Sequence, residues 1–552
     1  MSVVAAVANR GYAAFALAAR TRFERAAADP ARAQGEILRR ILRENAGSAY
    51  GAAHGFGSIR SVSEFRARVP RCDYDALRPA IERMVAGNAD LLTAHALRCF
   101  EPTGGSSGAS KLIPYTDALL SEISAATMPW VFDLLHHRPR LRNGSAYWAV
   151  SPPARRERAT PGGTRIGMEH DSDYFPRFVR ALLDRAIGTP RALAKIPDVA
   201  TCRYVTLRAL LARTDLAFLS VWNPSFLTLL AATLDECFPA LLHDLECGEL
   251  SVPLEPGLRD ELRRALPARP RVARELARRF GKTPPDDLGA IWDRLDLISC
   301  WADGHAARAL GAMRQRFPRV RVQPKGLLST EGVVSFPLAM AGGAVAAVCS
   351  HFLELVPQDA TDDAIGVAEA ETGRSYEVLL TTSGGLYRYA TKDLVRVDGW
   401  YHRTPVLTFV GRTDAASDLA GEKLTPRFVE QVIASALSEC RVRVPFAMLA
   451  PVWRGDDTPH YALFVECDAL DAERLAAVVE ARLCEAHPYA LCRELGQLSP
   501  VRGAAVEDGD ATYERGCLER GQRAGSIKPV ALDARLGWEA DFDRRMTASR
   551  VA

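Results

Sequence analysis

The spacing of apolar and polar residues predicts a chain that alternates between helices and short buried strands. Residues 1–50 show apolar side chains at helical spacing with charges between them, and predict two helices. Residues 216–221 and 295–301 are apolar runs, each followed by a turn and then by a helical pattern. Buried strands that feed helices are typical of βαβ units, so the sequence predicts an α/β fold with a parallel sheet. Ligands of such sheets lie beyond the carboxyl ends of the strands.

The middle of the chain predicts further strands with short connections. Residues 344–348 and 352–356 are short apolar segments, and residues 376–382 and 386–389 predict a hairpin across Ser383-Gly384-Gly385. We therefore expect mixed as well as parallel sheets in the large N-terminal part.

Beyond residue 414 the sequence predicts a small, separate α+β domain. Helical and strand patterns alternate there at short intervals, and the segment 413–418 is expected to join the two parts. We therefore expect two domains, residues 1–414 and residues 415–552. The predicted elements of the second domain are helix 426–437, strands 446–453 and 461–467, helix 472–485 and a strand near 501–506.

Composition narrows the class of protein. The sequence has 48% hydrophobic and 25% charged residues, as soluble globular proteins do. A formal charge of +3 on 552 residues argues against a dedicated nucleic-acid binder. The twelve cysteines form no C-x-x-C motif, so we expect reduced thiols and a cytoplasmic location. The apolar run 11–19 only loosely imitates a signal peptide, and no run reaches the ~20 uninterrupted apolar residues of a membrane span.

A Gly/Ser-rich loop between Phe100 and Leu112 is the strongest candidate for chemistry. Backbone N–H groups and hydroxyls of such a loop can converge on a phosphate, and a lysine at its rim adds a positive charge. A nucleophile elbow, G-x-S-x-G, would need a helix that begins at the serine, whereas Pro114 forbids an early helix and Thr116 is a plausible N-cap. A surface loop without function remains an alternative, and a Walker loop is excluded because Gly-Lys-Ser/Thr is missing. The loop residues are Ser106, Ser107, Gly108, Ala109, Ser110 and Lys111.

Three further groups of residues could complete a nucleotide and acid site. Thr330 and Glu331 could hold Mg²⁺, which prefers one or two carboxylates together with phosphate oxygens. Asp393 follows a predicted strand and could accept ribose hydroxyls, although a turn residue is the simpler interpretation. Trp222 and Trp301 follow the two apolar strands and could line a pocket for an acyl group, or be ordinary core aromatics.

Taken in order, these motifs resemble the Gretchen Hagen three family of acyl acid amido synthetases, in its bacterial branch, within the adenylate-forming, firefly-luciferase-like superfamily. The resemblance extends over nearly the whole chain, and the order of the motifs is far more specific than any one of them. The matching segments are Ile41-Leu42-Arg43-Glu44-Asn45, Tyr50-Gly51, Val69-Pro70, Lys111 to Pro114, Ser329-Thr330-Glu331, Phe352-Leu353-Glu354, Tyr387-Arg388-Tyr389, Gly411-Arg412 and the late Lys528.

The resemblance implies a large adenylate-forming domain and a small mobile C-terminal domain. It implies a two-step reaction in which a carboxylic acid and ATP give an acyl-adenylate, and an amino acid or other amine then forms an amide. ATP and Mg²⁺ would be the cofactors, small molecules the only partners, and the protein a monomer. Implied catalytic residues are Lys111, Glu331 and Lys528, of which Glu331 would hold the metal. The remaining implied contacts are Ser106 to Lys111, Ser329, Thr330, Asp393, Phe409 and Arg412 for ATP, and Trp222, Asn223, Trp301 and Gly326 for the acyl group.

Three departures from the family pattern concern nucleotide binding. Ala109 replaces a usual threonine, Lys392 a usual glycine, and Leu327 a usual adenine-stacking aromatic residue. A degenerate binding protein, which the changes at Ala109 and Lys392 favour, therefore stays open as an alternative. An acyl-CoA ligase also stays open, because it shares the first half-reaction.

Overall fold

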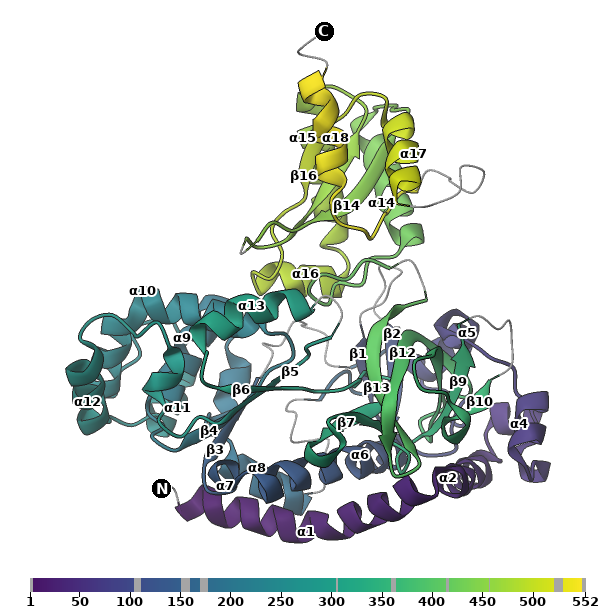
Figure 1. Ribbon diagram of the computed structural model, residues 1–552, viewed down its shortest axis with the longest axis horizontal. Helices are drawn as coiled ribbons and strands as arrows, with labels where there is room; N and C mark the ends of the chain where they lie inside the picture. The colour runs from purple at the N-terminus through teal and green to yellow at the C-terminus, as the bar shows by residue number, and fades with distance from the viewer. Residues whose placement is uncertain are drawn as a thin grey trace. The chain divides into compact units, whose positions relative to one another are not determined.

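The computed structural model describes residues 3–103, 111–149, 159–168, 177–303, 306–358, 364–413, 416–455, 457–520 and 530–548. Contacts divide the chain into two compact units (Figure 1). The large unit holds residues 1–102 and 112–413, and the small unit holds residues 414–552 together with the segment 103–111. The predicted α/β class is confirmed, because parallel and antiparallel sheets occur with many helices.

The parallel sheet contains, in order, β3 (Ser145–Trp148), β4 (Leu216–Ser220), β5 (Leu297–Cys300) and β6 (Arg321–Pro324). Every residue of β4 and β5 is buried, which explains their continuous apolar sequences. The predicted strand–helix units are confirmed, since α10 follows β4 and α13 follows β5. The helices in this part of the chain are α7 (Pro139–Arg142), α8 (Arg177–Ala186), α9 (Val199–Leu211), α10 (Ser225–Cys247), α11 (Pro256–Ala265), α12 (Pro270–Phe280) and α13 (Ala306–Arg316).

The second sheet is antiparallel and has the strand order β10, β9, β11, β12, β13, β8, β7. Its strands are β7 (Ser335–Leu338), β8 (Gly343–Ala346), β9 (Phe352–Pro357), β10 (Ile365–Gly366), β11 (Ser375–Thr381), β12 (Tyr389–Tyr401) and β13 (Thr404–Arg412). The predicted hairpin is confirmed by the pairing of Leu380 with Tyr389. The second strand begins at Tyr389 and not at residue 386, because Arg388 has a φ of 46°, which interrupts an extended strand.

Helices at the N-terminus begin where the sequence places their caps. The side chains of Ser61, Asp73 and Thr116 accept hydrogen bonds from backbone N–H groups three residues later, and Thr116 is thus the N-cap that the sequence analysis predicts. The segment after the Gly/Ser loop is extended, also as predicted, and pairs in a two-stranded sheet. These elements are α1 (Val3–Ala28), α2 (Pro30–Asn45), α3 (Ala49–Ala53), α4 (Val62–Arg68), α5 (Tyr74–Val85), β1 (Leu97–Thr103), β2 (Lys111–Thr116) and α6 (Asp117–His137).

Two helices among the described residues, α6 and α10, are long and apolar enough to cross a membrane by length and composition alone. Core helices of soluble proteins meet the same criterion, so this is weak evidence for a span. In α6, 72% of the most apolar window is buried. Leu234 and Leu241 of α10 are fully buried in a core with α9 and the parallel sheet.

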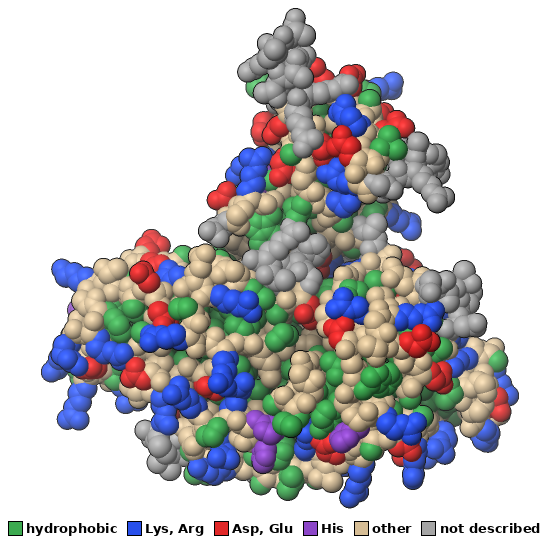
Figure 2. Space-filling model, in the orientation of Figure 1, with side chains coloured by type: hydrophobic (Ala, Val, Ile, Leu, Met, Phe, Trp, Pro, Cys, Tyr) green, Lys and Arg blue, Asp and Glu red, His purple; other side chains and the backbone are tan. Residues whose placement is uncertain are grey.

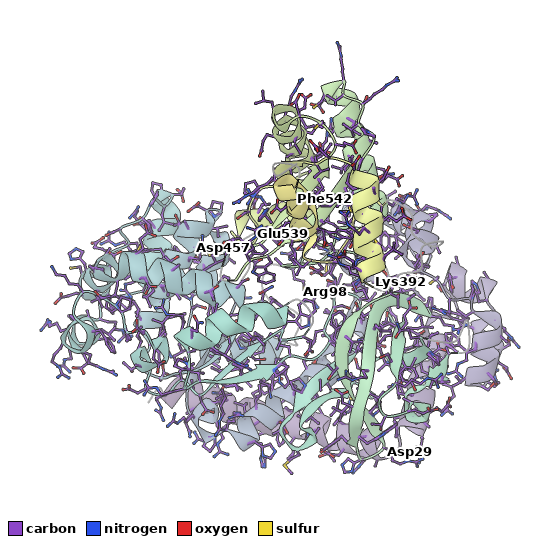
Figure 3. All side chains as sticks on the ribbon, turned by 45° about the horizontal axis from the view of Figure 1, so that its top comes forward. Asp29, Arg98, Lys392, Asp457, Glu539 and Phe542 are labelled. Carbon is purple, nitrogen blue, oxygen red and sulfur yellow. The ribbon has the colours of Figure 1, made fainter. Side chains whose placement is uncertain are left out.

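The small unit is an α+β structure with a three-stranded sheet. β14 (Ala447–Val452) and β15 (His460–Val465) are antiparallel, and β16 (Arg502–Ala505) is parallel to β15. Phe542, labelled in Figure 3, packs on Phe464 of β15 with ring centroids 4.6 Å apart. The helices are α14 (Pro426–Cys440), α15 (Ala469–Leu483), α16 (His487–Glu494), α17 (Gly509–Glu519) and α18 (Trp538–Ala548).

Charged side chains of both signs are mixed on the surface, and the cysteines are free. On the face shown in Figure 2, the described Lys and Arg side chains are interspersed with Asp and Glu. All twelve cysteines lie in the described part of the chain and are free thiols, as predicted.

Candidate active site

A tight turn at Ser329–Gly332 presents Thr330 and Glu331. The N–H of Ser329 donates to the carbonyl of Gly332 (3.0 Å), and the N–H of Gly332 donates to the carbonyl of Ser329 (3.3 Å). Next to them, Leu328 and Val333 form an antiparallel β-bridge. This is the pattern of a two-residue hairpin loop, so Thr330 and Glu331 occupy its tip.

Aromatic and imidazole side chains fix this turn from the core. The Tyr115 hydroxyl of β2 donates to the Thr330 carbonyl at 2.7 Å. A Cβ atom on Gly332 would lie 2.8 Å from Nε2 of the buried His351, so the close approach requires glycine. Gly326, which begins the approach to the turn, has a φ of 79°, and a Cβ there would lie 2.6 Å from the Ser335 carbonyl.

The charge of Glu331 acts on Tyr389, the first residue of β12. Burial raises the pKa of the Tyr389 phenol well above its ordinary value, Glu331 raises it further, and Arg412 opposes the shift. Asp393 of β12 is paired in register with Arg412 of β13, and its carboxylate accepts a 2.9 Å hydrogen bond from the guanidinium. We call Glu331, Tyr389, Arg412 and Asp393 the Glu331 cluster. It brings together three residues that the sequence analysis assigned to the nucleotide and its metal.

The residue before Asp393 has an unusual backbone conformation. Lys392, labelled in Figure 3, has a φ of 65°, in the left-handed region that favours glycine. This conformation gives a physical reason for the usual glycine at this position. The Lys392 ammonium lies 3.9 Å from the carboxylate of Glu377.

The two predicted pocket tryptophans lie side by side at the carboxyl ends of neighbouring strands. Trp222 follows β4, and Trp301 follows β5. The backbone N–H of Trp301 donates to the backbone carbonyl of Trp222 at 2.8 Å. The Trp301 ring lies 5.6 Å from the ring of Phe409 on β13, which joins a predicted acyl-site residue to a predicted nucleotide-site residue. Asn223 uses its Oδ1 to accept from the Ser225 N–H at the start of α10.

A second charged cluster lies deeper in the large unit. The Glu122 carboxylate of α6 accepts hydrogen bonds from Arg40 (2.7 Å), from the hydroxyl of Ser383 (2.6 Å) and from Nδ1 of His351 (3.1 Å). We call these residues the Glu122 cluster. Burial would raise the pKa of Glu122, but the hydrogen bond and charge of His351, followed by the charge of Arg40, hold it below the ordinary value.

Comparisons with known proteins identify the family. The family model for the GH3 family N-terminal domain matches residues 19–322, and the one for the GH3 family central domain matches residues 344–412. The second match ends at the last residue of β13. The chain belongs to the GH3 family. The predicted resemblance to Gretchen Hagen three proteins is thereby confirmed at the level of the family.

Several plant enzymes are similar to this GH3 chain. It is 25% identical to indole-3-acetic acid-amido synthetase GH3.8 of Oryza sativa subsp. indica over 438 residues, or 73% of this chain and 70% of the relative. It is 23% identical to jasmonoyl–L-amino acid synthetase GH3.5 of Oryza sativa subsp. japonica over 482 residues, or 80% and 81%. A solved structure of AtGH3.15 acyl acid amido synthetase in complex with 2,4-DB matches the fold with a TM-score of 0.65, 18% identity and 96% coverage of both chains.

Several predicted site residues of the GH3 chain fall outside the described residues, namely Ser106, Ser107, Gly108, Ala109, Ser110 and Lys528. Lys111 is described as the first residue of β2, and the next N–H, of Leu112, donates to the Tyr74 hydroxyl at 2.9 Å. The predictions for the Gly/Ser loop and for Lys528 stay predictions.

Sequence reasoning missed residues that support the turn. Tyr115 and Glu101 are examples: burial raises the pKa of the Tyr115 phenol well above its ordinary value, and the charges of Glu101 and Glu331 add to the effect. Glu101 directly follows the buried Cys99 and Phe100 on β1, and a carboxylate next to two such apolar residues was the available signal. His351 carried no such signal, because its partners Glu122 and Gly332 are distant in sequence.

Proposed function

We propose that this protein is an ATP-dependent acyl acid amido synthetase. The observation that carries the proposal is the Thr330-Glu331 turn beside Tyr389 and the Asp393–Arg412 pair, within a chain of the GH3 family. The plant relatives are named as enzymes that join an acid to an amino acid. These names support the same reaction class for this protein.

The proposed reaction has two balanced steps. An oxygen of the acid's carboxylate attacks the α-phosphorus of ATP, the bond to the β-phosphate oxygen breaks, and pyrophosphate leaves. The nitrogen of an amine then attacks the acyl carbon, the bond to AMP breaks, and the amine gives up a proton. Positioning and electrostatic stabilisation of developing charge are what nucleotidyl transfer chiefly demands.

The residues divide into roles within this proposal. Ser106 to Lys111 with Ser329 and Thr330 hold phosphates, Asp393 accepts ribose hydroxyls, and Phe409 and Arg412 contact the nucleotide. Trp222, Trp301, Asn223 and Gly326 surround the acyl group. Lys528 stabilises charge during adenylation from a mobile small domain formed by residues 415–552, while residues 1–414 bind ATP and acid.

The proposed metal site uses one protein carboxylate, that of Glu331. The described residues contain no group of three or more His, Cys, Asp or Glu side chains placed to hold a metal. Glu331 at the tip of its turn suits Mg²⁺, which takes one or two carboxylates and completes its shell with phosphate oxygens and water. Bound there, Mg²⁺ would neutralise phosphate charge.

Acid-dependent exchange between ATP and labelled pyrophosphate tests the first step. We expect exchange only with a suitable carboxylic acid from a panel, and mass spectrometry after addition of pooled amino acids should detect an amide and AMP. Thioester formation with added CoA and no amide would favour the acyl-CoA ligase alternative. Absence of exchange with every acid would favour a degenerate binding protein.

Three narrower assignments belong to the same proposal. Membership of a bacterial branch of the family is proposed from the sequence resemblance alone, whereas the relatives compared above are from plants. A cytoplasmic location and a monomeric state follow from composition and from the resemblance, and native mass spectrometry tests the latter.

A further inference from the structure

The helix α1 has one side buried against the large unit and another side exposed. It packs on α6 and α8 along one edge of this unit (Figure 1). Side chains that repeat every three, four or seven positions lie on the same side of a helix. The exposed side chains of α1 that follow this series are Val4, Val7, Ala14, Ala18, Arg22 and Arg25. We call this series the α1 stripe. It is apolar over most of its length and basic at its C-terminal end.

The apolar part of the stripe exposes large side chains. Val4 and Val7 are 57% and 62% exposed, and Leu17, at the edge of the stripe, is 52% exposed. A helix that covers a domain needs one apolar side, whereas α1 has an apolar side that faces water as well. Exposed apolar residues that share a face mark an interaction site, unlike those scattered singly. We therefore expect a partner to cover the stripe.

The nearest carboxylate on α1 is occupied by other groups of the protein. The first acidic residue of the sequence is Glu24. Its side chain pairs with Arg20 at 2.5 Å, accepts a 2.8 Å hydrogen bond from the Tyr401 hydroxyl and lies 2.9 Å from Nε2 of His402. The stripe itself contains no acidic residue.

Three arginines give the C-terminal end of the stripe a positive charge. Arg22 and Arg25 belong to the stripe, and the backbone N–H of Arg403 donates to the carbonyl of Ala27 at 3.0 Å, beside the end of α1. All three are exposed, and within the described ranges no salt bridge joins any of them to a carboxylate. Asp29, labelled in Figure 3, follows α1 and uses its side chain to cap α2. Three arginines beside one such aspartate leave this end positive.

Charge decides which partner fits the stripe. In a two-fold dimer the same surface meets itself. Antiparallel α1 helices would then place the arginines of one copy on the valines of the other, and parallel helices would bring like charges together. Both arrangements remove unpaired guanidinium groups from water, which is costly. A membrane with anionic lipids suits both parts of the stripe, because valines enter the boundary between headgroups and acyl chains while arginines meet lipid phosphates.

We propose that α1 docks the protein on a membrane surface that contains anionic phospholipids. The two valines and Leu17 enter the apolar boundary, and the three arginines contact phosphate groups. The helix lies on the membrane and does not cross it, since α1 is not one of the two described helices that are long and apolar enough for a span. Docking needs neither ATP nor an acid, so it is independent of the proposed function. It adds a partner to the small molecules that the family resemblance implies.

Flotation with phosphatidylcholine vesicles, with and without phosphatidylserine, tests the proposal. The full chain should float with vesicles that contain phosphatidylserine and not with phosphatidylcholine alone, and added salt should weaken the binding because it screens the charges. Arg22→Gln combined with Arg25→Gln should lower the partition coefficient on the order of tenfold, since each basic residue near an anionic surface contributes to binding. Val4→Ser combined with Val7→Ser should lower it to a similar extent, because the groups that enter the membrane are lost.

Matched controls remove the same kinds of group elsewhere. Leu470→Ser removes a leucine of α15 that is 86% exposed, and Arg264→Gln combined with Arg271→Gln removes two exposed arginines of α11 and α12. Vesicle binding by both controls should equal that of the parent. Thermal unfolding of every variant should match the parent, because all the changed side chains are exposed.

Three results would overturn the proposal. Equal flotation with both kinds of vesicle, or none with either, would exclude an anionic membrane as the partner. Equal binding by the stripe variants and the controls would place the contact elsewhere on the protein. A dimer in sedimentation velocity that Val4→Ser with Val7→Ser dissociates, without vesicle binding by the parent, would assign the stripe to a second copy of the chain.

Discussion

The Glu122 and Glu331 clusters are both built on a glutamate in the large unit, but they differ in how completely that glutamate is enclosed. The Glu122 side chain is 3% exposed, and both its oxygens accept hydrogen bonds from Arg40, Ser383 and His351. Glu331 stands at the tip of a hairpin turn and is partly exposed. A carboxylate whose oxygens are occupied by the protein supports the fold, whereas one at the tip of a fixed turn can meet a ligand.

The two clusters are nevertheless physically connected. The His351 ring, which donates to Glu122 through Nδ1, presses its Nε2 side against Gly332 at the base of the turn. Ser383 lies in the connection from β11 to β12, which leads to Tyr389 and Asp393. The enclosed cluster thus supports the segments that carry the exposed one, and separate substitutions can test this division of roles.

The largest effect is expected on stability from Glu122→Gln. The amide cannot hold Arg40 and His351 as a carboxylate does, and breaking a buried ionic group typically costs about 3–5 kcal/mol of unfolding free energy. Glu44→Gln is the matched control: Glu44 pairs with the same Arg40 at 3.2 Å but is 29% exposed, and should cost about 1 kcal/mol or less. Chemical denaturation measures both, and equal small losses would contradict a structural role for Glu122.

The same residue predicts a pH dependence of stability. Its pKa in the folded state lies below the ordinary value of 4.5, so the folded state favours the ionised form. The corresponding stability is present above pH 4.5 and lost as the pH falls through the lower folded-state pKa. When unfolding free energy is measured between neutral and acid pH, its decrease toward acid pH should be smaller in Glu122→Gln than in the parent. An equal decrease in both would assign the pH dependence to other carboxylates.

Glu331→Gln should instead affect activity and leave stability near that of the parent. Loss of one preorganised charged group typically costs about 10²–10³-fold in rate. We expect that loss in acid-dependent pyrophosphate exchange, with a higher requirement for Mg²⁺. Glu371→Gln, at a carboxylate that is 71% exposed, is the control. If Glu331→Gln responds to Mg²⁺ like the parent, the metal role is wrong.

The sequence predicted the elements better than the contacts between them. Helix starts at Ser61, Asp73 and Thr116 could be predicted because a cap acts over three residues. The βαβ pattern and the β11–β12 hairpin could be predicted for the same reason, since period and turn residues are local.

The missed residues depend on contacts between distant segments. The His351 ring meets Gly332 and Glu122 only because a helix and two connections converge, and Tyr115 reaches Thr330 across 215 positions. Assignments to the Gly/Ser loop and Lys528 rest on the family resemblance alone.

Tyr115→Phe should give an intermediate effect that is confined to the Glu331 cluster. It removes the 2.7 Å hydrogen bond to the Thr330 carbonyl, and leaving such a group without its donor costs about 1–3 kcal/mol. We expect a several-fold increase in KM for ATP from a less fixed turn. Tyr204→Phe, which removes a 2.8 Å bond to Asp244 away from this cluster, should lower stability without that increase. An unchanged KM for Tyr115→Phe would show that the turn keeps its position without the hydroxyl.

The smallest effect is expected at Lys392, whose backbone conformation favours glycine. A φ of 65° costs a residue with a Cβ atom about 1–2 kcal/mol, whereas glycine loses about 0.5–1 kcal/mol of entropy on folding. Lys392→Gly should therefore stabilise the protein by about 1 kcal/mol or less, with the loss of a weak contact to Glu377 as a further small cost. Lys392→Ala keeps the Cβ and removes the ammonium, so the difference between the two variants isolates the backbone term. If alanine and glycine have equal unfolding free energies, the strain of the left-handed conformation is no larger than the entropy that glycine loses on folding. The usual glycine before Asp393 would then need a reason other than backbone conformation, such as close approach of the nucleotide, and a lower KM for ATP in Lys392→Gly than in Lys392→Ala would identify it.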